Sequence, residues 1–216
     1  MKKWYYIHCM IPKTKNIPTS NFWKWQQSHK PIYKKILKNI DLAELFGTML
    51  GDGCIEKFKR TDKLTISFNR NEVEHIKHTA LLIERVFGKI PTTRKRKISH
   101  CDDLYFYQKN ISSRIDFPYS PKITKPLIIP NWIKRNKEFT RVCLKGMFET
   151  DGNFNIDDKY KTCVVSFSNR CMTLLDDLYQ VLKKLKYNPQ RRKIDVRLAK
   201  RIEVMKFINW INYRKY

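Results

Sequence analysis

Two aspartates have a setting in which they could do chemistry together. Asp52 and Asp151 lie 99 positions apart (151 minus 52), and each follows a helix-like stretch and precedes a glycine. A carboxylate at the C-terminal end of a helix faces the negative pole of the helix dipole, where a cation is preferred. If the two helices pack side by side, their carboxylates repel each other unless a cation neutralises them. A shared Mg²⁺ ion, which prefers oxygen ligands and retained water, would resolve the conflict.

The same shift of 99 positions reveals an internal duplication. It aligns Leu45 with Leu144, Gly47 with Gly146, Gly53 with Gly152, Ser67 with Ser166 and Phe68 with Phe167, with no gap. A single Asp-Gly pair is more simply interpreted as a helix-ending turn. Because both the acid and the glycine recur in register, the duplication favours a functional pair of acids.

Small residues line one face of each motif helix. Gly47 and Gly51 are four positions apart, as are Gly146 and Thr150, so each pair shares a helix face. Two glycines inside a helix cost roughly 1–2 kcal/mol relative to alanine. Such a cost is explained if the backbones must touch, so we expect the two helices to pack along a pseudo-twofold axis.

Each copy predicts a helix, two strands, a helix and two more strands. The expected helices are 41–51, 73–87, 136–150, 172–185 and 204–212, and the expected strands are 64–69, 90–99, 102–110, 163–167, 190–194 and 196–200. We expect Asp41 to cap the first helix in a capping box with Glu44. Gly53 and Gly152 are expected to end the motif helices in the left-handed conformation. The pattern predicts an α+β fold whose antiparallel sheets leave one face free.

The chain divides into four predicted segments. Residues 1–40 form an N-terminal extension to which the sequence assigns no role. Residues 41–116 form the first repeat, residues 117–136 a linker, and residues 137–216 the second repeat. The linker contains Pro118, Pro121, Pro126 and Pro130, which favour an ordered or extended conformation.

Charge predicts a polyanionic partner. The 216 residues contain 45 Lys and Arg against 20 Asp and Glu, a net charge of +25 spread along the chain. No apolar run approaches the roughly 20 residues of a membrane span, so we expect no membrane partner. The six cysteines form no C-x-x-C pair and no export signal is present, so we expect reduced thiols and an intracellular protein.

The two motif segments, LFGTMLGDG at 45–53 and LKGMFETDG at 144–152, resemble the paired motifs of single-chain LAGLIDADG homing endonucleases. The flanks Ile66–Asn71, Val165–Arg170 and Ile129–Ile133 are also similar, and the resemblance covers about residues 40–212. It implies a monomer with two four-stranded antiparallel sheets that form a saddle in the DNA major groove. It also implies intron homing: metal-dependent cleavage of both strands at the centre of a long double-stranded site, leaving short 3′ overhangs.

The resemblance also implies roles for individual residues. Asp52 and Asp151 would bind Mg²⁺, for which Mn²⁺ could substitute, together with the backbone carbonyls of Gly51 and Thr150. Thr150 departs from the glycine of the family motif, which tolerates a slightly wider helix spacing. Polar groups at the strand ends would orient water or stabilise the leaving phosphate; the candidates are Asn69, Arg70, Ser168, Asn169 and Arg170, and their pairing between halves is ambiguous by one position.

Basic and polar residues of the strands are the candidates for DNA contact. A free sheet face rich in Arg and Lys would contact phosphates and guanine edges. The candidates are Lys57, Lys59, Arg60, Thr65, Ser67, Asn69, Arg94, Lys95, Arg96, Lys97, Lys109, Ser166, Ser168, Arg191, Arg192, Lys193, Arg197 and Lys200. For any one of them an ordinary solvated strand edge is as good an interpretation, but for the whole set it is not.

Two other functions compete with DNA cleavage. An RNA maturase would use the same fold to bind intron RNA, and a DNA-binding regulator would use a decayed copy. Retention of both Asp52 and Asp151 argues against the regulator. His75 and His78 share a helix face, but no third ligand accompanies them and we expect a surface role.

Overall fold

The computed structural model describes residues 33, 35–97, 99–120, 126–157, 159 and 162–214. Nearly all of the predicted N-terminal extension lies outside the described residues. The chain from residue 34 to residue 216 forms one compact unit. No helix in the described part is long and apolar enough to cross a membrane.

The tandem αββαββα order is confirmed. The first repeat consists of α2 (Ile40–Asp52), β1 (Gly53–Lys57), β2 (Asp62–Asn69), α3 (Val73–Phe87), β3 (Thr92–Lys95), β4 (Cys101–Gln108) and the short α4 (Ile111–Ile115). After α5 (Asn131–Lys134), the second repeat consists of α6 (Lys137–Thr150), β5 (Gly152–Asp157), β6 (Thr162–Ser168), α7 (Met172–Lys184), β7 (Gln190–Arg191), β8 (Asp195–Leu198) and α8 (Arg201–Ile211). Strands β3 and β7 are shorter than the sequence predicts.

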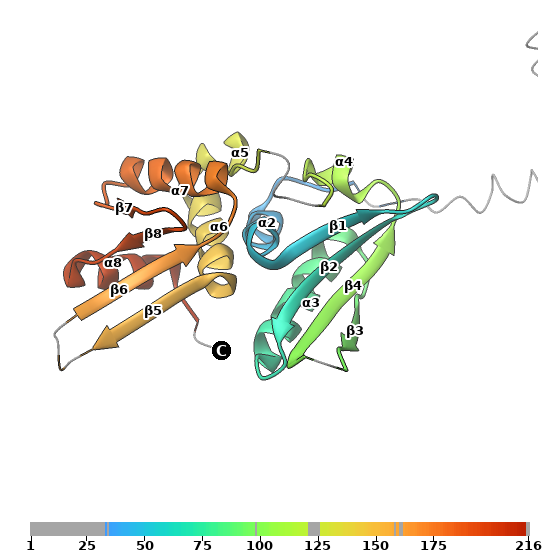
Figure 1. Ribbon diagram of the computed structural model, residues 1–216. Coiled ribbons are helices and arrows are strands. Elements are labelled where there is room, and N and C mark those ends of the chain that lie inside the picture. Colours follow the sequence, from blue (N-terminus) through green and yellow to red (C-terminus); the bar gives the residue numbers. More distant parts are fainter. Residues whose placement is uncertain are drawn as a thin grey trace, which may run out of the picture. The chain divides into compact units, whose positions relative to one another are not determined.

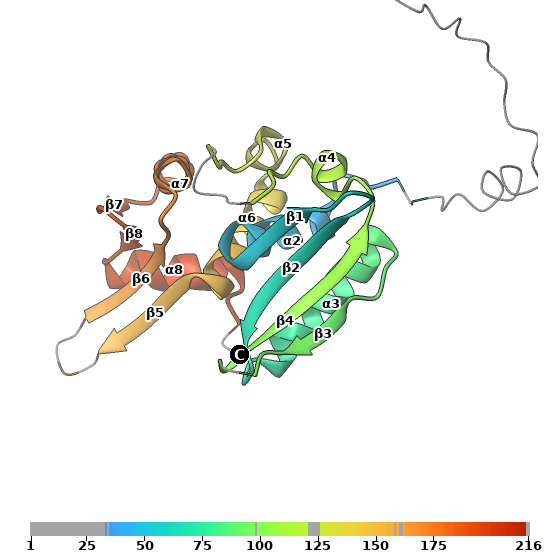
Figure 2. The same cartoon turned by 45° about the vertical axis from the view of Figure 1, so that its right-hand side comes forward.

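Two antiparallel four-stranded sheets flank the central helices α2 and α6 (Figure 1). Their strand orders are equivalent, β1-β2-β4-β3 and β5-β6-β8-β7. Alternate residues of the second strands are buried, Leu64, Ile66 and Phe68 in one half and Cys163, Val165 and Phe167 in the other. Helix α3 lies behind the first sheet and α8 behind the second (Figures 1 and 2). Each sheet therefore has one helix-covered face, which is apolar, and one free face.

Helices α2 and α6 pack so closely that side chains would collide at the glycines. A Cβ atom on Gly47 would lie 2.0 Å from the carbonyl oxygen of Cys143, and one on Gly146 would lie 2.5 Å from that of Glu44. The structure thus places both glycines where one helix backbone meets the other.

The ends of the motif helices differ from the sequence expectation. Asn39, not Asp41, caps α2, because its Oδ1 accepts a hydrogen bond from the Leu42 N–H (2.9 Å); Asp41 instead pairs with Arg85 at 3.0 Å. Gly53 is extended, with φ −80°, so the predicted left-handed conformation is wrong. A Cβ there would lie 2.5 Å from the Cα of Met49, and close contact explains the glycine.

The left-handed conformation expected at Gly152 is wrong in the same way. Gly152 does not have a positive φ, and a Cβ on it would lie 2.1 Å from the Phe148 carbonyl oxygen.

The described part of the linker runs against α7: the Leu127 N–H donates to Thr173 Oγ1 (3.0 Å) and the Ile129 N–H to Asp177 Oδ2 (2.8 Å). Residues 121–125, which include Pro121, lie outside the described residues.

Candidate functional site

The acid-bearing ends of the two motif helices meet. Asp52 is the last residue of α2, and Asp151 follows the last residue of α6. A Cβ placed on Gly51 would lie 2.1 Å from Thr150 Oγ1 and 3.5 Å from the carboxyl carbon of Asp151. Asp52 is exposed and Asp151 half-buried. Gly51 therefore lets the end of α6 approach, and brings the Asp151 carboxylate close to the end of α2.

Thr150 takes the place of the second glycine without opening the helix contact. Its hydroxyl donates back within α6, to the carbonyl oxygens of Gly146 (3.1 Å) and Met147 (3.0 Å). This bonding satisfies the hydroxyl inside its own helix. The helix contact at this level is therefore glycine against threonine.

Asn169 holds the Asp151 carboxylate. Its Nδ2 donates to Asp151 Oδ2 at 2.9 Å, while its Oδ1 accepts from the Cys171 N–H at 2.9 Å. In the first half, Asn69 makes the same turn, accepting from the Asn71 N–H at 3.1 Å. These turns pair Asn69 with Asn169, an offset of 100 (169 minus 69), although the strands before them and the helices after them keep the offset of 99.

The two arginines that follow these asparagines have different surroundings. Arg70 donates from Nε to Asp102 Oδ1 (2.9 Å), and from a terminal nitrogen to the carbonyl oxygens of Arg96 (2.9 Å) and Ser99 (3.2 Å). It therefore ties the loop between β3 and β4. Arg170 is exposed and lines a pocket of about 300 Å³ together with Gly51, Asp151 and Asn169. Of the two predicted arginines, the structure brings Arg170 to the pocket that Asp151 lines.

The strand pairing sorts the predicted DNA-contact residues. Thr65, Ser67, Asn69, Arg94, Ser166, Ser168 and Arg197 lie on the free faces, because residues paired across a ladder point to the same side. Lys59, Arg60, Arg96, Lys97, Arg192 and Lys193 lie in loops between strands, and Lys109 and Lys200 lie just beyond strand ends. Lys57, Lys95 and Arg191 have the opposite parity and lie on the helix-covered side.

Contacts of two of these three residues agree with that parity. Lys57 Nζ lies 5.5 Å from the centre of the Tyr119 ring, and Arg191 Nε donates to Asp176 Oδ1 of α7 at 2.8 Å. A run of basic residues contains both parities of a strand, so the run alone does not identify a face. Only the register does.

Sequence reasoning missed an acid on the first free face. Asp103 is paired with Arg94 across the ladder and is fully buried. Its burial alone would raise its pKa, but hydrogen bonds from Arg96, Arg94 and Ser67 lower the pKa to about 2. The sequence signal was the alternation of side chains along β4, which puts Asp103 on the face opposite to that of the core residue Leu104.

His75 is not a surface residue, contrary to the sequence expectation. It is buried, with its ring 4.9 Å from that of Phe68. Burial lowers the pKa of His75 to about 4, and the charges of Arg214 and His78 act in the same direction. His78 Nε2 lies 2.9 Å from Glu44 Oε1. His75 therefore packs α3 against β2, and His78 ties α3 to α2.

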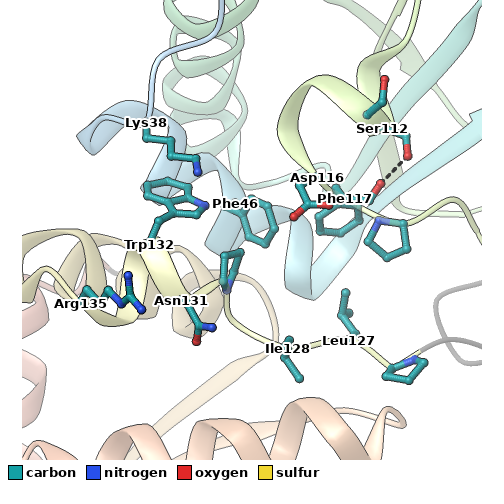
Figure 3. A pocket seen from close by; sticks show the side chains of 14 residues that line it. Lys38, Phe46, Ser112, Asp116, Phe117, Leu127, Ile128, Asn131, Trp132 and Arg135 are labelled. Atoms are coloured by element: carbon teal, nitrogen blue, oxygen red, sulfur yellow. Dashed lines mark hydrogen bonds between the residues drawn. The ribbon is translucent and has the colours of Figure 1, made fainter.

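Among the described residues, two other kinds of site would compete with the helix ends: a metal-binding cluster and a pocket away from the acids. Within the described ranges, no three or more His, Cys, Asp or Glu side chains are grouped to hold a metal ion. A pocket of about 900 Å³ lies between α2, α4 and α5 (Figure 3). Its lining includes Phe46, Phe117 and Trp132 but neither acid. The paired helix ends remain the strongest candidate site.

Comparisons with known proteins agree with this architecture. Residues 138–215 match the family model of the LAGLIDADG-like domain. Among solved structures, the homing endonuclease I-WcaI bound to its DNA recognition sequence is 19% identical, with TM-score 0.56 over 90% of this chain and 88% of that chain. I-DmoI in complex with DNA and Mn is 16% identical, with TM-score 0.53 over 82% of this chain and 100% of that chain.

Mesophilic variants of I-DmoI are likewise 16% identical, with TM-score 0.52 over 79% of this chain and 94% of theirs. No curated protein matches the sequence. At such identities the likeness to solved structures shows the fold.

Proposed function

We propose that this protein is a site-specific endonuclease, because residues 138–215 match the family model of the LAGLIDADG-like domain and the chain shares the fold of homing endonucleases. It cleaves both strands of a long DNA site by metal-dependent phosphodiester hydrolysis. The observation that carries the proposal is the meeting of two acid-bearing helix ends, at Gly51 and Thr150, beside two free sheet faces. A single chain supplies both acids, so it acts as a monomer.

The donors at the helix ends fit a hard divalent cation. Asp52 and Asp151 supply carboxylate oxygens, and the carbonyls of Gly51 and Thr150 lie at the C-terminal helix ends, where a cation is favoured. Oxygen-only donor sets suit Mg²⁺ and Mn²⁺. When bound, such an ion supplies positive charge to the phosphodiester and lowers the cost of generating a nucleophile.

The chain's own residues bind and orient the substrate. The net charge of +25 favours a polyanion, and the free sheet faces carry hydroxyl, amide and guanidinium groups that suit phosphate and base contacts. Asn169 fixes the orientation of the Asp151 carboxylate. Arg170, exposed in the pocket that Asp151 lines, is placed to neutralise a phosphate at the cleavage point.

A cleavage assay tests this function. We expect the purified protein with Mg²⁺ to linearise a plasmid that carries the insertion site of its host intron. Asp52→Asn and Asp151→Asn should each abolish cutting and leave DNA affinity within a few-fold of wild type. Asp116→Asn is the matched control: Asp116 is exposed and left-handed (φ 57°), a conformation that asparagine tolerates, so this variant should cut normally.

Two other results would point to other functions. Specific binding of intron RNA and promotion of splicing, without cutting in Mg²⁺ or Mn²⁺, would favour the maturase. Specific DNA binding without cutting or splicing would favour a regulator. Retained cutting by Asp52→Asn or Asp151→Asn would contradict the assigned roles of the acids.

A further inference from the structure

An acid on a face that should attract DNA calls for an explanation. Asp103 lies in the middle of β4, directly opposite Ser67 of β2 and Arg94 of β3, on the free face of the first sheet. None of its side chain is exposed, although the face itself is open. A carboxylate there weakens the attraction for phosphate, so it must provide something else.

The basic residues around Asp103 cover it and are fixed by it. Arg94 donates from a terminal nitrogen to Asp103 Oδ2 at 2.7 Å. Arg96 makes a two-pronged contact, from Nε to Oδ2 (3.0 Å) and from a terminal nitrogen to Oδ1, and also reaches Ser67 Oγ at 2.9 Å. Ser67 in turn donates to Asp103 Oδ1 at 2.9 Å. One acid thus holds two guanidinium groups.

Both guanidinium groups still face solvent. The Arg94 side chain is 57% exposed and that of Arg96 45% exposed. Arg94 donates a single N–H to Asp103, so most of its five donors remain available. Its guanidinium carbon lies 5.9 Å from the centre of the Tyr105 ring. Two arginines around one acid also keep a net positive charge. Arg96, by contrast, uses its Nε and one terminal nitrogen on Asp103 and Ser67, so Arg94 is the residue with a fork available to read guanine O6 and N7 in the major groove.

The second sheet has no such acid at this position. Opposite Ser166, the counterpart of Ser67, stands Arg197, whose Nε donates to Gln190 Oε1 at 2.9 Å. Arg197 is therefore oriented by a neutral amide. The two free faces differ in chemistry at equivalent places, so they would read their two half-sites differently.

We propose that Asp103 is a positioning residue that fixes Arg94 to recognise guanine in the half-site covered by the first sheet, while Arg96 covers the acid. The proposal rests on the proposed function, since it takes double-stranded DNA as the substrate. It goes further by assigning specificity in one half-site to a particular side-chain cluster. Without Asp103 the two arginines would still attract phosphate, but Arg94 would lose the fixed geometry that selects a base.

The test separates base preference from affinity. Wild-type protein is used, without divalent metal, to select preferred sequences from a randomised duplex library, and every base pair of the selected site is then substituted in turn. We expect a guanine preference at one or two positions of one half-site. Asp103→Ala and Arg94→Lys should each reduce that preference roughly tenfold or more, while preferences in the other half-site persist.

Matched variants make the result interpretable. Arg94→Lys keeps the charge and the partner of Asp103 but removes the fork, so it answers the question even if Asp103→Ala folds poorly. Glu74→Gln removes one negative charge from α3, where Glu74 pairs with Lys77, and should leave every base preference unchanged. Affinity of Asp103→Ala for unrelated DNA should equal or exceed that of wild type.

Different failures have different meanings. If no sequence is selected, the proposed function itself fails. If a site is selected but Asp103→Ala or Arg94→Lys keeps the full guanine preference, the positioning role is overturned. A uniform loss of affinity across all sequences would also overturn it, because Asp103 would then only hold β3 to β4.

Discussion

Among single side chains, Asn169 connects the fold to the acid. Its Oδ1 closes the turn that starts α7, and its Nδ2 reaches Asp151 Oδ2 at 2.9 Å. Asn69 closes the equivalent turn in the first half. Removing a group that orients a metal-binding carboxylate commonly lowers metal affinity or activity by roughly 10–100-fold.

We therefore expect Asn169→Ala to raise the Mg²⁺ concentration for half-maximal cleavage by roughly tenfold or more. The equilibrium constant for DNA binding without metal should change little. Metal-titrated single-turnover cleavage and a binding isotherm measure the two quantities. Asn188→Ala, which removes an exposed asparagine side chain, is the control and should keep the wild-type Mg²⁺ requirement. An unchanged Mg²⁺ requirement in Asn169→Ala would count against the positioning role.

His75 predicts how stability depends on pH. Burial lowers its pKa from 6.5 to about 4, helped by the charges of Arg214 and His78 and opposed by Glu44; Glu72 Oε2 also lies 3.5 Å from its Nδ1. Below pH 6.5 the unfolded chain binds a proton that the folded protein does not. The free energy of unfolding should therefore fall by roughly 3 kcal/mol between pH 6.5 and pH 4, and no further from this group below it.

Urea denaturation across that pH range measures the effect. His75→Phe, which keeps a ring against Phe68, should flatten the slope in this range even if its stability differs overall. His100→Gln changes an exposed histidine and should keep the wild-type slope. Equal slopes in wild type and His75→Phe would show that His75 does not titrate as described.

At the level of elements, the sequence predicted what repeats and missed what depends on three-dimensional packing. The order of helices and strands followed from hydrophobic periodicity and from the duplication, because both halves bury the same alternate residues. The left-handed ends expected at Gly53 and Gly152 were wrong. Glycine is compatible with positive φ and with close approach, and the sequence alone does not say which requirement applies.

The candidate site shows the same division. The two acids and the small residues of the helix faces were readable, since their types and spacing recur. The sheet face on which each basic residue lies was not readable. For Lys95 and Arg191, for example, the face depends on the strand register. Asp103 was missed because its meaning lies in its cross-strand partners. The His75 ring is buried against Phe68 of β2, a contact that the sequence of its own helix does not encode.

For the whole molecule, a cluster of charges behind the helix contact joins the two halves. Arg214, just after α8, donates from one terminal nitrogen to both Glu44 Oε1 of α2 (2.7 Å) and Glu149 Oε2 of α6 (2.8 Å). Its Nε and backbone N–H both reach Glu149 Oε1 (3.0 and 2.9 Å). Burial alone would raise the pKa of Glu44, but His78, Lys145 and Arg214 hold it at about 2. Arg214 thus pairs with one carboxylate from each motif helix, Glu44 of α2 and Glu149 of α6.

Arg214→Met should destabilise the protein more than a typical surface substitution does. The Glu149 side chain is 1% exposed, so losing the guanidinium removes the positive charge beside a buried carboxylate, and removing one member of such a pair costs about 3–5 kcal/mol. Arg60→Met, in the exposed turn between β1 and β2, should cost little. Adding Glu149→Gln to Arg214→Met should recover part of the loss, because it removes the uncompensated charge. Chemical denaturation measures all four proteins, and equal stability of Arg214→Met and wild type would mean that the packing of α2 on α6 alone joins the halves.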